Sequence, residues 1–173
     1  MDFFDVVKRR RSIRAFTEKI PPEEDVMKLI EAARCAPSAG NIQPWEFIVV
    51  RRPEIKRRLC EAALGQSFVE EAPVVIVVCA NVDWSRRGYG IRGAELYCLQ
   101  DTAAATQNIL LAAEASGLGA CWVGAFNEDK VREVLKVPHG LRPVALIPIG
   151  YPAETPRPPY KRPLEEIVHY ETF

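Results

Sequence analysis

One apolar run constrains the fold of this chain more than any other part of its sequence. Residues 74–80 read Val-Val-Ile-Val-Val-Cys-Ala, an almost unbroken series of β-branched side chains. A half-exposed strand alternates apolar and polar residues, so this run predicts a strand that is buried on both faces. It is the longest apolar run of the chain, whereas a membrane-spanning helix needs about 20 such residues. We therefore expect a globular chain built around this strand, with no membrane partner.

Weaker patterns on both sides of this strand predict further helices and strands within a single domain. Helical spacing of apolar residues, prolines in first turns and a glycine at a helix end mark the helices, and short β-branched runs mark the strands. No repeat, linker or change of composition divides residues 1–173. The pattern predicts one α/β domain, with residues 81–93 as a glycine- and arginine-rich loop. The predicted helices are 2–11, 21–36, 53–64, 94–116 and 127–137, and the other predicted strands are 45–50, 120–123 and 144–149.

The charge and the cysteines narrow the classes of function. Lysine and arginine number 23, and aspartate and glutamate also number 23, so the formal net charge is zero. Nucleic-acid-binding domains usually carry a basic excess, and we expect no nucleic-acid partner. Five scattered cysteines without a CxxC pair are typical of reduced thiols, and with no signal peptide they predict a cytoplasmic protein. Neither of the two histidines has a cysteine nearby, so no metal site is expected.

Residues 152–173 form a proline-rich arm. Five prolines between 152 and 163 predict extended backbone, because proline fixes φ and cannot donate a hydrogen bond to a helix. Residues 164–170 are expected to form one short turn or an edge segment. We expect this arm to lie along another surface.

The first candidate for function is the run Arg10-Arg11-Ser12-Ile13-Arg14. A basic run is often only a solvated helix end, where positive charge is favourable. Here a serine hydroxyl interrupts the guanidinium groups, and Ile13 can turn inward. Two or three guanidinium groups with a hydroxyl can bind a phosphate dianion through charge-assisted bonds of roughly 1.5–3 kcal/mol each. Both interpretations remain open from the run alone.

The second candidate is the segment Pro37-Ser38-Ala39-Gly40-Asn41-Ile42-Gln43-Pro44, between a predicted helix and a predicted strand. Prolines and a glycine are ordinary in such a connection, so a plain loop is one interpretation. Three hydrogen-bonding side chains nevertheless fall within six residues, around a glycine that permits close approach. This group suits a planar heterocycle with donors and acceptors on its rim, and we favour binding over a plain loop.

Motifs for other chemistry are weak or missing. Residues 88–93 read Gly-Tyr-Gly-Ile-Arg-Gly, a literal GxGxxG, but the predicted strand ends near Ala80. A dinucleotide-binding site needs its first glycine directly after a strand, so a flexible loop bordering a pocket is the better interpretation. The sequence contains no GxxxxGK[ST] phosphate loop and no GxSxG nucleophile elbow. If the protein is an enzyme, a bound cofactor rather than a catalytic side chain is expected to supply the reactive atom.

Taken in order along the chain, five stretches resemble the nitroreductase family of FMN-dependent oxidoreductases. Each stretch is weak alone, but the ordered combination is specific and covers nearly the whole chain. The stretches are RRRSIRAF at 9–16, PSAGNIQPWEFIVV at 37–50, QNILLAAEASGLGACWVGAF at 107–126, PVALIPIGYP at 143–152 and KRPLEEIV at 161–168.

The resemblance implies an α+β fold in which helices flank a central mixed β-sheet. Members of the family are intertwined homodimers with two FMN sites at the subunit interface, so the arm would extend onto the partner subunit. The implied reaction is a ping-pong hydride transfer from NADH or NADPH, through FMN, to a small-molecule electron acceptor such as a nitroaromatic, a quinone or a free flavin. Residues 81–93 leave little room for the helices that shape the substrate pocket in longer members.

The resemblance also assigns cofactor-binding residues. The basic run at residues 10–14 resembles the contacts to the FMN phosphate and ribityl chain, with Arg162 closing on the phosphate from the arm. Residues 37–41 resemble a segment that lies against the flavin from the other subunit, and Gln43 resembles a residue that supports it. Gln66 resembles a side chain that reaches the ring, and the N–H of Gly124 resembles a donor that stabilises charge on the reduced flavin. The expected set is Arg10, Arg11, Ser12, Ile13, Arg14, Pro37, Ser38, Ala39, Gly40, Asn41, Gln43, Gln66, Val123, Gly124, Ala125 and Arg162, with Lys161 as a further candidate.

Two other functions remain open from the sequence. A protein that binds flavin for storage or regulation, with little turnover, would fit the short segment at residues 81–93. An interaction protein that places residues 8–14 on nucleic acid is a third hypothesis, which the zero net charge disfavours.

Overall fold

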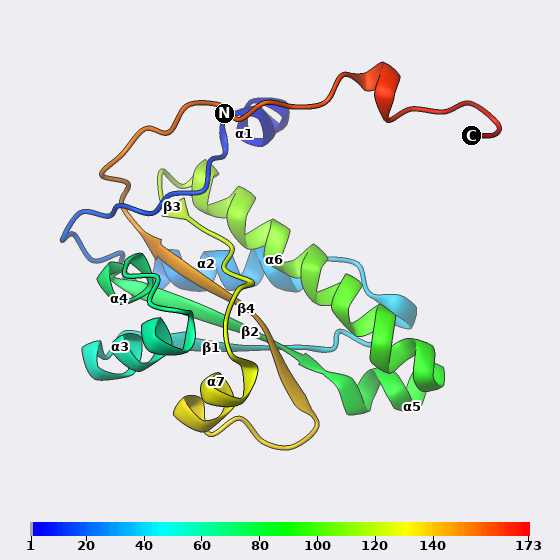
Figure 1. Cartoon of the computed structure of the whole chain (residues 1–173), viewed down its shortest axis with the longest axis horizontal. Coiled ribbons are helices and arrows are strands. Elements are labelled where there is room, and N and C mark those ends of the chain that lie inside the picture. The colour runs from blue at the N-terminus through cyan, green and yellow to red at the C-terminus, as the bar shows by residue number, and fades with distance from the viewer. Residues whose placement is uncertain (1) are drawn as a thin grey trace.

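A four-stranded sheet forms the centre of the protein (Figure 1). The structure is a computed structural model that describes residues 2–173. Strands β1 (Trp45–Val50), β2 (Val74–Asn81), β3 (Gly119–Ala120) and β4 (Leu141–Gly150) stand in the order β1-β2-β4-β3. Every pairing among these strands is antiparallel. A mixed sheet was expected, and its parallel part is a single isolated bridge between Ser12 and Ala120. The α+β class is confirmed.

Strand β2 is buried along its whole length, as the apolar run predicts. Alternate side chains of a strand point to opposite faces. Val74, Ile76 and Val78 join one hydrophobic cluster, and Val75 and Val77 join the other. Helices α2 (Glu23–Arg34) and α6 (Cys98–Ala115) pack on the first face, and α3 (Pro53–Ala62), α4 (Phe68–Glu71) and α7 (Glu128–Leu135) pack on the second.

The predicted loop at residues 81–93 is wrong. This segment folds into helix α5 (Val82–Arg92), and a π-helical turn, η2 (Gly93–Tyr97), joins it to α6. The side chain of Asn81 caps α5 by accepting a hydrogen bond from the N–H of Trp84 at 3.1 Å. Glycine disfavours helix by only about 1 kcal/mol, so a cap and tertiary contacts override it. The helix breaks at Tyr89 and Gly90, where Gly90 has a φ of 58°.

The strand predicted at residues 120–123 is shorter than expected. Strand β3 ends at Ala120, and beyond it only Val123 forms a bridge, to Leu146 of β4. Residues 124–126, which follow the predicted strand, also lie outside any helix or strand. Their backbone groups are therefore free for contacts other than sheet pairing.

The segment after the first helix pairs with the root of the arm beside the sheet. Helix α1 (Phe3–Arg9) is followed by an extended segment that pairs with the start of the arm through a bridge between Phe16 and Pro152. Beyond this root the arm is extended, as predicted, with one 3₁₀ turn, η3 (Leu164–Glu166). Figure 1 shows the arm passing α1 and leaving the body of the protein. Its large apolar side chains are exposed: Tyr160, Leu164, Ile167, Val168, Tyr170 and Phe173.

Within residues 2–173, no helix is both long and apolar enough to cross a membrane. The same residues contain no group of three or more His, Cys, Asp or Glu side chains that could hold a metal ion. All five cysteines are free, and four of them are buried. Burial raises the pKa of Cys79 to about 12, so this thiol stays protonated and unreactive at neutral pH.

Candidate functional site

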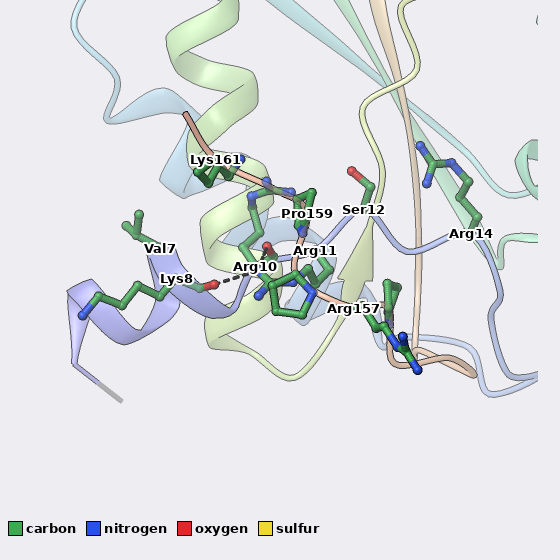
Figure 2. A pocket seen from close by; sticks show the side chains of 11 residues that line it. Val7, Lys8, Arg10, Arg11, Ser12, Arg14, Arg157, Pro159 and Lys161 are labelled. Carbon is green, nitrogen blue, oxygen red and sulfur yellow. Dashed lines mark hydrogen bonds between the residues drawn. The ribbon is translucent and has the colours of Figure 1, made fainter. Parts of the chain in front are cut away.

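A cavity of about 590 Å³ lies between α1, the segment that follows it and the arm (Figure 2). We call this cavity the basic pocket. Its volume is within the range of small-molecule sites. In Figure 2, Arg10, Arg11 and Lys161 gather beside α1, and Arg14 lies on the far side of Ser12. The lining residues are Val7, Lys8, Arg10, Arg11, Ser12, Arg14, Pro156, Arg157, Pro158, Pro159 and Lys161.

The basic pocket carries an excess of positive charge. Six of its lining side chains are Lys or Arg, and in the part of the chain described here no acidic side chain lines it. None of the six is paired in an ion pair within residues 2–173. The guanidinium of Arg11 donates instead to the carbonyls of Lys8 and Arg10, at 2.6 and 2.8 Å. Unpaired cations around one cavity favour an anionic ligand such as a phosphate.

The segment at residues 12–14 is held in place by its backbone. The N–H of Ile13 donates to the carbonyl of Ala120 at 3.0 Å, and the side chain of Ile13 is buried against Gly119. Because side chains alternate along an extended segment, Ser12 and Arg14 then face the pocket. Ile13 was expected to turn inward and does so, which places its side chain in the core rather than in the cavity.

Glu154 fastens the arm to this segment, and sequence reasoning missed it. Its Oε1 accepts hydrogen bonds from the N–H groups of Arg14, at 2.5 Å, and Ala15, at 3.1 Å. The two partners lie 140 residues apart, so no local signal could have identified the contact. Glu154 thereby joins the root of the arm to the segment that follows α1.

The three basic residues of the arm have different positions. Arg157 and Lys161 line the basic pocket. Arg162 does not line it, and its guanidinium donates to the carboxylate of Glu166 at 3.2 Å and to the carbonyl of the same residue at 2.8 Å. Within one chain, Arg157 and Lys161, and not Arg162, therefore supply the charge from the arm.

A second surface continues from the basic pocket past Arg14. The guanidinium of Arg14 lies 5.7 Å from the centre of the Phe68 ring, and Gln66 is two residues away in the chain. The side-chain amide of Gln66 donates to the carbonyl of Ala125 at 3.0 Å. Gly124 is an exposed residue whose N–H donates to no group within residues 2–173, whereas the N–H of Val123 donates to the carbonyl of Leu146. Residues 66 and 123–125 are thus brought together, with one main-chain donor free at Gly124.

The segment at residues 37–43 has an unusual backbone. Gly40, Asn41 and Gln43 have φ angles of 56°, 56° and 54°, in the left-handed region that only glycine adopts without cost. The hydroxyl of Ser38 accepts a hydrogen bond from the N–H of Gln43 at 2.9 Å and closes the turn. Pro37 and Asn41 are exposed, and the Tyr89 hydroxyl of α5 occupies the space beside Gly40. We call residues 37–43 the left-handed loop.

Within one chain, the left-handed loop and the basic pocket do not meet. The loop contacts the first turn of α6, where the N–H of Ala39 donates to Oδ1 of Asp101 at 3.1 Å. The end of α1, directly before the pocket residues Arg10 and Arg11, lies near the last turn of α6, where Nε of Arg9 is 3.6 Å from Oε1 of Glu114. Thirteen residues of helix separate these contacts, or roughly 20 Å at 1.5 Å per residue. Figure 1 shows the two regions at opposite ends of α6.

Comparison with known proteins gives a consistent result. The sequence pattern of the nitroreductase family matches residues 7–69 and 62–151. An NADH dehydrogenase of Thermus thermophilus is 37% identical over 187 residues, covering 92% of this chain and 91% of that protein. An FMN reductase (NADPH) of Bacillus subtilis is 31% identical over 182 residues, covering 98% and 73%. The crystal structure of a nitroreductase family protein from Clostridium novyi superimposes with a TM-score of 0.80 at 38% identity, covering 89% and 87%.

Proposed function

The chain belongs to the nitroreductase family, and on that premise we propose that it is an FMN-dependent oxidoreductase that takes hydride from NADH or NADPH. The names of the Thermus and Bacillus relatives support both nucleotides as donors. Electron-poor small molecules such as nitroaromatics, quinones or flavins are the proposed acceptors. Donor and acceptor react in turn at one site, and FMN, when bound, supplies the group that accepts and returns the hydride.

The observation that carries this proposal is the basic pocket. FMN is a phosphate monoester, and the pocket offers unpaired guanidinium groups, the hydroxyl of Ser12 and the ammonium of Lys161 without a competing carboxylate. Charge-assisted bonds of this kind are the strongest that side chains offer to phosphate. Arg10, Arg11 and Arg14 hold the phosphate in this proposal. The donor set therefore fits the cofactor of the family.

The free N–H of Gly124 has a role in the same proposal. A main-chain donor placed where negative charge develops stabilises that charge without reorganisation. The bond from Gln66 to the carbonyl of Ala125 fixes the backbone beside Gly124. No side chain of this chain needs to act as a nucleophile or a general base, and the protonated, buried Cys79 is consistent with that.

We further propose that the complete site forms between two copies of the chain. One copy supplies the basic pocket with residues 66 and 123–125, and the other supplies the left-handed loop. The separation of roughly 20 Å along α6 supports this division, because no single chain brings both parts together. Exposed apolar side chains on α1 (Phe3, Phe4 and Val7) and along the arm offer the surface that such a dimer would bury.

An anaerobic absorption spectrum tests the proposed activity. Protein reconstituted with FMN should show the spectrum of oxidised flavin, which should bleach on addition of NADH or NADPH. Flavin that stays oxidised with both nucleotides would favour storage over turnover. A protein that binds no FMN after reconstitution would overturn the proposal.

A tagged heterodimer tests the shared site. Arg14→Ala damages the basic pocket, and Gly40→Val damages the left-handed loop, because a β-branched residue is strongly disfavoured at a φ of 56°. The two variants are co-expressed with different tags, and the dimer that carries both tags is purified. If the site is shared, the two-fold axis places both defects in one of its two sites and leaves the other site undamaged. About half of the sites should then bind FMN. If each chain holds a complete site, every site of that heterodimer carries one defect and flavin binding stays low.

A further inference from the structure

Asp101 is a buried carboxyl group outside the residues discussed as ligands. It lies in the first turn of α6 and is 7% exposed. Its Oδ1 accepts the bond from Ala39, whereas Oδ2 is buried and has no hydrogen-bond partner within residues 2–173. A buried carboxyl group with one unpaired oxygen costs stability. The side chain therefore needs an explanation other than packing.

The other buried polar side chains on this face of α6 are satisfied within the helix. Cys98, Thr102 and Thr106 each donate to the carbonyl four residues earlier. These groups contact no part of the left-handed loop through hydrogen bonds. Asp101 differs from them because its one bond leaves the helix and reaches a residue 62 positions away.

The bond from Asp101 lies where the left-handed loop begins. Ala39 starts the 3₁₀ turn η1 (Ala39–Asn41), directly before the left-handed residues Gly40 and Asn41. Non-glycine residues in this conformation persist only where surrounding contacts fix the backbone. Asp101 holds the start of the loop, and the hydroxyl of Ser38 holds its end at Gln43.

We propose that Asp101 is a positioning residue for the cofactor, which acts by fixing the left-handed loop through the N–H of Ala39. The inference rests on the proposed function, in which this loop lies against the flavin of the partner subunit. Loss of the carboxylate leaves the loop's own ligands in place but removes the contact that orients them. The bond to Ala39 needs only an oxygen acceptor, so an amide can replace the carboxylate.

Three full-length variants test this role: Asp101→Ala, Asp101→Asn and Thr106→Val. The readouts are the Kd of the apoprotein for FMN, the midpoint potential of the bound flavin and the Tm. Asp101→Ala should weaken FMN binding by about tenfold or more, as expected for a lost hydrogen bond to a charged group, and shift the potential. Asp101→Asn should restore FMN affinity to within about threefold of wild type, because its amide oxygen still accepts from Ala39.

Thr106→Val is the matched control. Thr106 is fully buried on the same helix and bonds only to Thr102. Its replacement should lower the Tm and leave both the FMN affinity and the potential unchanged. A loss of affinity in this variant equal to that in Asp101→Ala would show a general effect of helix stability and overturn the positioning role.

Wild-type affinity and potential in Asp101→Ala would also overturn the inference. If Asp101→Ala does not fold, Asp101→Ser replaces it, because the serine hydroxyl is one bond shorter than the carboxylate. Wild-type affinity and potential in Asp101→Ser would overturn the inference in the same way. Failure of the wild-type protein to bind FMN contradicts the proposed function itself. The two failures are therefore distinguishable in one series of titrations.

Discussion

The basic pocket and the left-handed loop are built by different physical means. Side chains make the basic pocket: six cationic side chains line an open cavity, and a backbone hydrogen bond from Ile13 to Ala120 fixes the segment behind them. Backbone conformation makes the left-handed loop: positive φ angles, the Ser38 contact and the Asp101 contact set its shape. The first region should bind through charge and the second through shape, so changes to the ligand and to the protein should separate them.

The largest expected effect comes from removing the phosphate of the ligand. Riboflavin keeps the ring that the left-handed loop would contact but lacks the group that the basic pocket would hold. Two lost charge-assisted bonds predict binding on the order of 100-fold weaker than that of FMN. Fluorescence titration of the apoprotein with both ligands measures the ratio. Equal affinities would show that the basic pocket does not hold the phosphate.

Arg14→Ala should have the next largest effect. Loss of one guanidinium from the basic pocket should weaken FMN binding by about 10- to 100-fold and leave riboflavin binding nearly unchanged. Arg57→Ala is the control, because Arg57 is exposed on α3 outside the basic pocket. An equal loss of affinity for both ligands would assign Arg14 to the ring or to folding rather than to the phosphate.

Gly40→Ala should reverse that pattern. Alanine at a φ of 56° costs about 1–2 kcal/mol, and its Cβ would lie 2.5 Å from the Tyr89 hydroxyl. FMN and riboflavin should lose affinity by the same factor, because the loop would contact the part that they share. Gly117→Ala is the control, with a φ of 73° and no atom within 4 Å of the added Cβ. A selective loss of FMN binding in Gly40→Ala would contradict the division between charge and shape.

The same contrast explains which parts of the molecule the sequence could predict. Charge is a property of residue types, so the basic run was recognisable without a structure. Local signals were also sufficient for β2 and for α7, where the side chain of Asn127 accepts from the N–H of Lys130 at 2.9 Å as its capping role predicts. The loop shape depends on Asp101, and the root of the arm depends on Glu154, both far away in the chain.

Helix α5 shows the limit of composition as a guide. Its glycines and arginines predicted a loop, yet the cap at Asn81 and contacts with the left-handed loop outweigh weak helix propensity. The added Cβ of an alanine at Gly88 would overlap the end of the Ile42 side chain. Glycine at this position therefore permits close packing of α5 against the left-handed loop, and the sequence alone does not separate that use of glycine from flexibility.

The smallest expected effect concerns the titration of Asp101. Burial raises the pKa of this carboxyl above its ordinary value of 3.8, although the bond from Ala39 partly opposes the shift. Between 3.8 and the raised pKa, the native state binds more protons than the unfolded state, so the free energy of unfolding falls as pH rises. Asp101→Asn removes this titration. The stability of the variant relative to wild type should therefore increase from about pH 4 upward and level off above the raised pKa.

Urea unfolding of the two apoproteins across that pH range measures the difference. Asp129→Asn serves as the control, because Asp129 is exposed on α7 and far from the left-handed loop in the chain. A difference that does not change with pH would mean that the Asp101 carboxyl is as well solvated in the native state as in the unfolded state. The hydrogen bond from Ala39 to Asp101 would then form with little cost for burying the carboxylate. The shape of the loop would depend more on Ser38 and Tyr89 than on α6.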